Sequence, residues 1–328
     1  MKTHTHISII IIMLLLATMS YSTAFHKNNE QLPIFEIKRQ ETKYNSGNNF
    51  ASFIHHHPFF IKPLEKIFPY LDLTDETSDE TEYWALLIAV GVYLNNSHQD
   101  RPTMLTEVEN IYESLVSSNN WESKNIMKIK GRQATLENIL SGFNWLTRKE
   151  GKNDVSLIYI TTHGYYLNQD LPPYDEADGK DEILVPYEGF EDTSKFLWDD
   201  EINFFCSILQ SKEVCLIVDS CFSGGFNDAY AKTISPSQQW MTDFLKEMNG
   251  KSGRVILMSS EEDEVSYGST FSHYIAHGLF TGGADANHND VISAEEAFEY
   301  AEPYVTRYGR QQPTMVDACS GELTLVCE

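Results

Sequence analysis

The chain is poor in basic residues. It has 24 Lys and Arg against 48 Asp and Glu, which gives its 328 residues a formal net charge of −24. Nucleic acid is therefore excluded as an expected partner, because a protein that neutralises phosphates needs a surplus of Lys and Arg. Repeats at the period of solenoid proteins are also missing. Hydrophobic residues make up 41%, which is enough for a globular protein with a large core.

Long apolar runs are missing outside the N-terminus. There, Lys2 is followed by an apolar run over residues 7–17 and by small residues that end at Ala24. A positive start, a short apolar centre and a small-residue exit are typical of a secretory signal peptide, and the run is short for a membrane span. We therefore expect residues 1–24 to be a signal peptide and the mature protein to be secreted, without a stable membrane span. An uncleaved anchor is the alternative.

Cysteine is scarce and odd in number, with five residues. Export places them in oxidising surroundings, where thiols pair and an odd count leaves one unpaired. Cys221 is the candidate for the unpaired thiol. Cys319 and Cys327 flank the last strand-like run and could pair with each other. Cys206 and Cys215 could also pair, but both stand in apolar patterns, so we expect them to be buried.

Residues 25–80 show little hydrophobic periodicity and are rich in Asn, Gly, His and Pro. We interpret them as an N-terminal extension or pro-segment. Three consecutive histidines at 55–57 could bind a metal, but no further ligands stand at useful spacing, which favours a surface cluster. The regular pattern begins after this segment, and we expect a single domain over residues 81–328.

Short apolar runs alternate with segments of helical periodicity in residues 81–328. Runs that are apolar on both faces predict buried strands, and their alternation with helices predicts an α/β fold with a mainly parallel sheet. The expected strands cover residues 84–92, 125–130, 154–162, 214–220 and 254–260, and the expected helices cover residues 103–118, 135–147 and 199–210.

Two of these strands end in side chains that can do chemistry. The segment YITTHGYY carries His163, and the segment IVDSCFSGG carries Cys221. Substrates of such sheets bind beyond the carboxyl ends of the strands. If the two strands are neighbours, the imidazole can take the proton of the thiol, and the glycines let backbone N–H groups face an oxyanion. Either residue alone would be interpreted as inert, but the pair favours a catalytic dyad.

The two segments resemble the caspase-like cysteine peptidases of clan CD, family C14, in particular the metacaspases and their bacterial and archaeal relatives. The resemblance spans residues 83–326. It implies a caspase–haemoglobinase fold, with a mainly parallel six-stranded sheet, helices on both faces, and an antiparallel last strand near residues 323–326. It also implies that His163 and Cys221 are catalytic and that the N–H groups of Gly164 and Cys221 form the oxyanion hole. Thr162 departs from the Gly or Ser that is frequent in the family.

The resemblance further implies a specificity. True caspases have Gln two residues before the nucleophile and cleave after Asp, whereas metacaspases have Asp there, as at Asp219. A buried carboxylate binds Arg or Lys through charge-assisted hydrogen bonds and repels an acidic side chain. Glu107 stands near the place of a second pocket acid, where the family usually has Asp. The alternative for Asp219 is a cap of local backbone N–H groups.

Four acids match, position by position, those with which calcium-dependent metacaspases bind their ion. They are Asp181, Asp199, Asp200 and Asp228. Ca²⁺ takes about six to eight oxygen ligands, so carboxylates from three loops could surround it. The alternative is that Asp199 or Asp200 caps a helix beside a solvated loop.

A second oxygen-rich stretch, residues 285–296, follows the pattern of an EF-hand loop. Its ligand positions would be filled by Asp285, Asn287, Asn289, the carbonyl of Val291, Ser293 and Glu296. Asp290 departs from the pattern, since Gly normally makes the sharp turn there, and residues 278–284 are a poor entering helix. The resemblance places such a loop inside the peptidase domain. An Asx turn that caps the following helix is an equal alternative.

The segment after Cys221 is polar and uneven, so we expect a mobile loop over residues 227–253. It contains Lys232, Lys246 and Lys251, each a match to the predicted pocket. We expect calcium to order the loops beside Cys221 and to permit self-cleavage after Lys232 or Lys251.

The predicted function is that of a secreted, calcium-activated cysteine endopeptidase whose protein or peptide substrates have Arg or Lys before the cut. One alternative is an exported calcium-binding or adhesion module on an inactive caspase-like fold. Another is a cysteine hydrolase or transpeptidase that uses the same dyad on a different acyl substrate.

Overall fold

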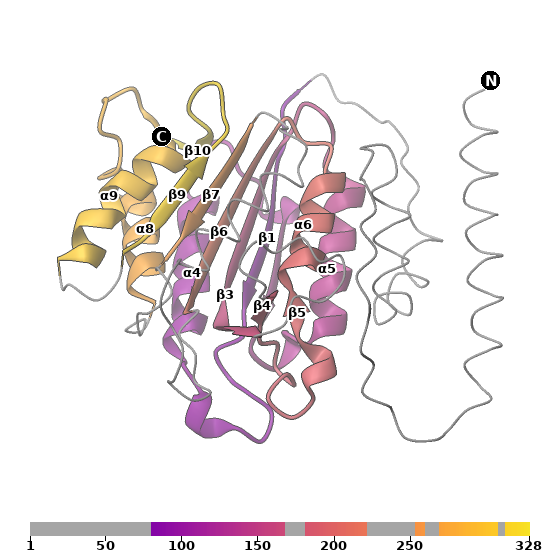
Figure 1. Ribbon diagram of the computed structural model, residues 1–328. Helices are drawn as coiled ribbons and strands as arrows, with labels where there is room; N and C mark the ends of the chain where they lie inside the picture. The colour runs from indigo at the N-terminus through magenta and orange to yellow at the C-terminus, as the bar shows by residue number, and fades with distance from the viewer. Residues whose placement is uncertain (1–79, 168–180, 222–252, 260–268, 308–311) are drawn as a thin grey trace, which may run out of the picture. The chain divides into compact units, whose positions relative to one another are not determined.

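The computed structural model describes residues 80–167, 181–221, 253–259, 269–307 and 312–328. A twisted sheet with helices on both faces forms the centre of this part (Figure 1). In spatial order, its main path consists of β2 (Ile126–Lys130), β1 (Tyr83–Ala89), β3 (Val155–Leu167), β6 (Glu213–Cys221), β7 (Arg254–Met258) and β9 (Thr314–Asp317). All neighbours are parallel except β9, which is antiparallel to β7. The predicted fold class is confirmed.

Two short strands extend the sheet beside the end of β3. They are β4 (Asp181–Leu184) and β5 (Leu197–Trp198), and β4 pairs antiparallel with both β3 and β5. Because β3 continues past His163 into this ladder, it is longer than the apolar run 154–162 predicts.

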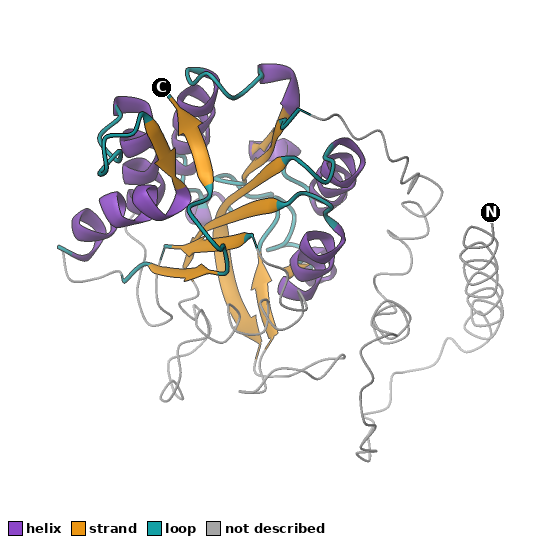
Figure 2. Ribbon diagram, turned by 90° about the horizontal axis from the view of Figure 1, so that it is seen from above, coloured by secondary structure: helices purple, strands orange, loops and turns teal. Residues whose placement is uncertain are grey.

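The helices form one layer on each face of the sheet (Figures 1 and 2). One face is covered by α5 (Leu136–Lys149) and α6 (Asp199–Ile208), and the other by α4 (Thr103–Val116), α8 (Thr270–Thr281) and α9 (Ala294–Thr306). The strand β1 shows why its sequence is continuously apolar. Leu86 and Ile88 pack into the core on the α5 side, whereas Ala85 and Leu87 pack into the core on the α4 side, and all four are fully buried.

The helix α5 illustrates how local sequence sets an element and its packing. Thr135 caps its start, with Oγ1 accepting the N–H of Asn138 at 3.3 Å. Gly142 lies in its middle, where a Cβ would stand 2.7 Å from Cδ1 of Ile129 and 2.8 Å from Cδ1 of Leu86. A side chain at this position would force Ile129 and Leu86 to shift, so Gly142 lets α5 pack closely on β1 and β2.

The antiparallel edge strand lies at a different place from the one predicted. The strand β9 pairs with β7, with Val316 opposite Ile256. The segment expected in that place forms β10 (Thr324–Cys327), which pairs with β8 (Val291–Ser293) in a separate two-stranded sheet. The expectation for residues 323–326 was wrong, because two short half-apolar segments follow each other near the C-terminus and local pattern does not tell which one reaches β7.

The helix α8 was also missed. Residues 278–284 were judged a poor helix, yet α8 runs through Thr281 and ends at Gly282, whose φ of 70° closes it in the left-handed conformation. The oxygen-rich loop that begins at Asp285 therefore follows a helix of twelve residues.

Cys206 and Cys215 are fully buried and form no disulfide, as expected, and Cys319 and Cys327 are partly exposed and not joined to each other. In the ranges that the structure describes, no helix is both long and apolar enough to cross a membrane. The predicted signal peptide, the extension up to residue 79, and the loop with Lys232, Lys246 and Lys251 lie outside those ranges.

Candidate active site

The ladder between β3 and β6 brings the two predicted dyad residues side by side. Its parallel register starts with Val155 opposite Glu213 and ends with His163 opposite Cys221. Adjacent strands lie ~4.8 Å apart, so the backbones of His163 and Cys221 are neighbours at the carboxyl end of the parallel β3–β6 ladder. This is the edge at which parallel sheets bind their substrates.

The imidazole of His163 lies among aromatic rings. The distances between ring centroids are 5.2 Å to Tyr93, 5.8 Å to Phe190 and 6.4 Å to Tyr165. Its Nε2 stands 2.9 Å from the carbonyl oxygen of Gln99, in the turn between β1 and α4. A carbonyl oxygen only accepts hydrogen bonds, so in the neutral ring Nε2 carries the hydrogen and Nδ1 keeps a lone pair. Nδ1 is therefore the atom that can act as a base.

The surroundings of His163 keep it neutral. Burial lowers the pKa of His163 below its usual value, and the positive charge of Arg101 lowers it further, while the hydrogen bond to Gln99 acts in the opposite direction. A neutral imidazole at physiological pH is the form that can accept a proton from a thiol.

Thr162, the residue that departs from the family pattern, holds the backbone next to His163. Its Oγ1 donates to the carbonyl of Val185 and lies 3.0 Å from Oη of Tyr93. Oη of Tyr93 also accepts the N–H of His163 at 3.1 Å. Burial raises the pKa of Tyr93 to about 12, so its phenol stays protonated and can donate to Thr162. Thr162 is thus part of the support of the candidate base.

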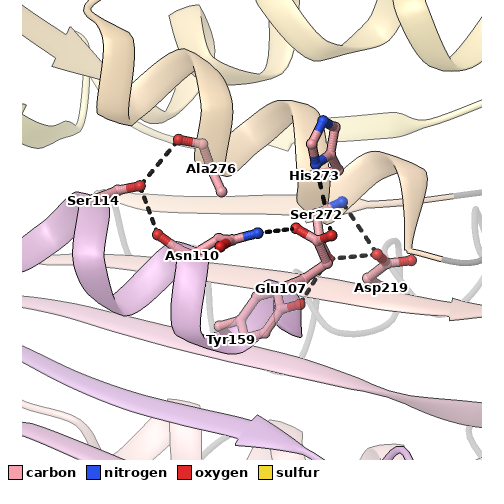
Figure 3. A network of polar contacts seen from close by, with 8 residues as sticks. All are labelled: Glu107, Asn110, Ser114, Tyr159, Asp219, Ser272, His273 and Ala276. Atoms are coloured by element: carbon pink, nitrogen blue, oxygen red, sulfur yellow. Dashed lines mark hydrogen bonds and ion pairs between the residues drawn. The ribbon is translucent and has the colours of Figure 1, made fainter. Parts of the chain in front are cut away.

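Asp219 lies two residues before Cys221, with 2% of its surface exposed. Its Oδ2 accepts the N–H of Ser272 at 3.1 Å and also the hydroxyl of Ser272 (Figure 3). Ser272 is the third residue of α8, whose N-cap residue Ser269 makes no side-chain cap. Asp219 therefore satisfies a free N–H of the first helical turn. It does cap a helix, but a helix remote in sequence, unlike the local cap considered as its alternative.

Ser272 itself accepts a hydrogen bond from a further residue. The hydroxyl of Tyr159, a fully buried residue of β3, donates to Oγ of Ser272 at 2.7 Å. Burial raises the pKa of Asp219, whereas the two hydrogen bonds from Ser272 lower it. The chain from Tyr159 through Ser272 to Asp219 thus opposes the effect of burial and favours the ionised carboxylate.

Glu107 reaches the same region from α4 (Figure 3). Only 11% of its side chain is exposed, and its Oε1 lies 3.6 Å from Nδ1 of His273, the residue after Ser272. Its Oε2 accepts a hydrogen bond of 2.9 Å from the amide of Asn110. The charges of Asp219 and Glu107 both raise the pKa of Tyr159, which is already raised by burial. The structure therefore brings the two predicted pocket acids together around the first turn of α8.

The residues that contact these acids were missed in the sequence. The segment TFSHYIAHGLF has helical spacing and could have predicted α8. No local signal, however, shows that Ser272 and His273 meet Asp219 and Glu107. The hydrogen bond from His163 to Gln99 had no signal either, because it uses a backbone carbonyl, which every residue has.

Three of the four acids of the first predicted calcium site lie near one another along the backbone. The β4–β5 ladder sets Ile183 opposite Trp198. Asp181 stands two residues before Ile183, and Asp199 and Asp200 follow Trp198 as the first residues of α6. Asp199 is buried. The fourth acid, Asp228, lies outside the described residues.

The loop of residues 285–296 has features of both interpretations considered for it. Asp285 accepts the N–H groups of Asn289 and Asp290, each at 3.1 Å. Asp290 has a φ of 62°, so it makes the left-handed turn for which Gly is usual. Ser293 and Glu296 form a reciprocal capping box at the start of α9. Across the described ranges, no three side chains of His, Cys, Asp or Glu are grouped to hold a metal ion.

The middle of the chain is similar to known proteins. A model of the metacaspase peptidase C14 domain matches residues 85–230. Metacaspase-1 of Candida albicans is 31% identical over 156 residues, which are 44% of this chain and 34% of that protein. Metacaspase-1 of Plasmodium falciparum is 29% identical over 186 residues, which are 51% of this chain and 29% of that protein. The chain thus spans about a third of the length of these curated relatives.

Among solved structures, the protein GSU0716 from Geobacter sulfurreducens aligns with 75% of this chain and 97% of its own. Its identity of 13% and TM-score of 0.49 are too low to define a function.

The parallel sheet, the pairing of His163 with Cys221 and the sequence matches agree with one another. Over residues 85–230 the chain is similar to the peptidase C14 domain of metacaspases. Its similarity is to metacaspases, and the bacterial and archaeal branch stays a prediction.

Proposed function

We propose that this protein is a secreted cysteine endopeptidase that cleaves after Arg or Lys and is activated by calcium. The observation that carries the proposal is the β3–β6 register, which sets His163 opposite Cys221 at the carboxyl end of these two central strands. A thiol and a base within reach of each other are what nucleophilic acyl transfer needs.

In the proposed reaction, Nδ1 of His163 takes the proton of Cys221, and the thiolate attacks the carbonyl carbon of the scissile bond. The N–H groups of Gly164 and Cys221 donate to the oxyanion of the tetrahedral intermediate. When the intermediate collapses, the C–N bond breaks and the imidazolium gives its proton to the leaving amine. Water then loses a proton to His163, attacks the thioester, and releases the new carboxyl terminus and the thiol.

The preference for Arg or Lys is supported by the two pocket acids. Asp219 and Glu107 are both nearly buried, and neither forms an ion pair with Lys or Arg in the described part of the chain. A guanidinium or ammonium group of a substrate would supply a partner of opposite charge.

The proposed calcium ion would be bound by carboxylate oxygens of the protein. Asp181, Asp199, Asp200 and Asp228 would hold one ion, and carboxylates are the ligands that this hard cation prefers. The pairing of β4 with β5 supports the site, because it gathers three of these acids at one end of a ladder. The loop of residues 285–296 would hold a second ion, through the oxygens predicted for it. Ion binding would activate the enzyme and permit its cleavage after Lys232 or Lys251.

The test is a cleavage assay on the mature chain, with peptides that carry Arg, Lys or Asp before the scissile bond. We expect Arg and Lys peptides to be cut, faster with calcium than with chelator, and the Cys221→Ala variant to be inactive. Mass spectrometry of the same samples reports self-cleavage, and N-terminal sequencing of protein from the culture medium reports signal removal. Preference for Asp would contradict the specificity, and calcium binding without any cleavage would favour the adhesion module.

A further inference from the structure

The two pocket acids differ in what opposes their charge. Asp219 is held by the N–H and hydroxyl of Ser272, both neutral donors. Glu107 instead faces the imidazole of His273, a group that can become positively charged. His273 is half exposed, with 52% of its side chain accessible, so its ring is in contact with solvent.

We propose that His273 is a specificity-determining residue of the pocket, because it competes with the Arg or Lys of the substrate for Glu107. The inference rests on the proposed function and names a residue that regulates its pocket. An ion pair between His273 and Glu107 would leave Asp219 as the acid that attracts the substrate. Without that pair, both carboxylates would be available.

The hydrogen bonds of Glu107 make this competition direct. Asn110, one turn further along α4, donates to Oε2 at 2.9 Å and so occupies one of the two carboxylate oxygens. The other oxygen, Oε1, is the one that lies 3.6 Å from Nδ1 of His273. A cation that binds Oε1 of Glu107 would therefore share this oxygen with His273 (Figure 3).

Among the described residues, the other neighbours of His273 do not provide a competing carboxylate. On its own helix, its ring lies 5.2 Å from that of Tyr274 and 6.3 Å from that of His277. His277 is in turn 2.9 Å from Oη of Tyr300 on α9. Within the described residues, Glu107 is the acid that stands within ion-pair distance of His273. In this part of the chain, His273 is thus paired with one of the two candidate pocket acids.

The experiment varies the charge at this position and the charge of the substrate together. His273→Lys fixes a positive charge next to Glu107, and His273→Gln removes it. Each is assayed on two peptides, one with arginine and one with citrulline, its neutral isostere, before the scissile bond. We expect His273→Lys to raise KM for the arginine peptide about 10-fold and His273→Gln to lower it about 3-fold, with kcat and the citrulline peptide changed less than about 2-fold. His277→Gln, one turn away and not facing Glu107, is the matched control and should change neither.

A Glu107→Gln background separates charge competition from a structural role. There, the Lys and Gln substitutions at His273 should give equal KM values for the arginine peptide. Equal effects on both peptides, or effects that persist in this background, would overturn the inference, and thermal unfolding of each variant checks that it is folded. A wild type that cuts no Arg or Lys peptide would contradict the proposed function itself, whereas a cleaving wild type with indifferent His273 variants contradicts only the role of His273.

Discussion

Burial has opposite consequences at the candidate base and at the first pocket acid. At His163 it disfavours the charged form and so keeps the ring ready to accept a proton. At Asp219 it also disfavours the charged form, but the proposed binding of Arg or Lys requires the charge of this carboxylate. The polar partners of the two residues differ in keeping with these roles. His163 is surrounded by aromatic rings, whereas Asp219 receives two hydrogen bonds from the start of α8.

A general base and a carboxylate that binds a cation, placed on neighbouring strands, need different polar partners. A base needs a single acceptor to fix its tautomer, which Gln99 provides. A buried carboxylate needs donors, because an unpaired charge is costly in an apolar interior. The predictions that follow change these partners one at a time.

The largest effect is expected from the dyad itself. Cys221→Ala or His163→Ala should lower kcat/KM by about 10³-fold or more, equally for arginine and citrulline peptides, because both substitutions stop the chemical step. Steady-state kinetics measures this effect, and unchanged thermal unfolding serves as the control. Near-full activity in either variant would remove the dyad assignment.

A smaller and selective effect is expected at Asp219. Asp219→Asn keeps the shape and an acceptor for the N–H of Ser272 but removes the charge. Cleavage of the arginine peptide should fall about 10²-fold, because the guanidinium loses a buried ionic partner. The citrulline peptide should be affected much less. A loss that is the same for both peptides would mean that Asp219 serves only to cap α8.

Ser272→Ala tests the donor rather than the acid. Loss of the hydroxyl should raise the pKa of Asp219 further, since one hydrogen bond to the ionised form disappears. Asp219 is ionised only above its pKa. As the pH falls, the variant should therefore lose cleavage of the arginine peptide at a higher pH than the wild type does. On this acidic side, its cleavage rate should be about 10-fold below that of the wild type.

Tyr159→Phe is the matched control for the serine, because it removes the hydrogen bond to Ser272 but keeps the hydroxyl on Asp219. In Tyr159→Phe, the acidic limb of the pH profile for the arginine peptide should also move to higher pH, but by less than in Ser272→Ala. A citrulline peptide whose acidic limb moves as far as that of the arginine peptide would show that the effect is not on the pocket acid.

The smallest effect is expected at Arg101, whose charge lowers the pKa of His163. Arg101→Gln should raise that pKa. His163 is active as a base only above its pKa, so the acidic limb of kcat/KM should move to higher pH. The citrulline peptide is the substrate of choice, because the pocket acids matter little to it. A limb that stays in place would show that solvent screens Arg101 from His163.

Much of the scaffold could be predicted, because its signals are local. The strands that carry His163 and Cys221 are apolar runs buried on both faces, and their ends are readable from the side chains that follow. The helices α4, α5 and α6 begin at the residues that the periodicity predicts, or within one of them. The local pattern did not identify α8. The antiparallel strand, which was placed through the resemblance, was assigned to the wrong segment, since the pairing partner of a segment does not show in its own sequence.

The pocket could be predicted only in part. Asp219 and Glu107 were singled out through a resemblance to metacaspases, and the structure brings them together. Their partners Ser272 and His273 were not, because the three elements that meet there are far apart in the chain. The contact depends on α8 packing against α4, where Oγ of Ser114 donates to the carbonyl of Ala276 at 3.0 Å (Figure 3).

The sequence by itself therefore determined the α/β class, the positions of the central strands along the chain and the residues His163 and Cys221 that follow two of them, because hydrophobic periodicity and strand termini are properties of short segments. Only the tertiary structure decided which atom of His163 is free to act as a base, which donors reach Asp219, and that Glu107 faces a histidine. These depend on backbone carbonyls and helix termini from distant segments, whose approach is set by the packing of helices on the sheet.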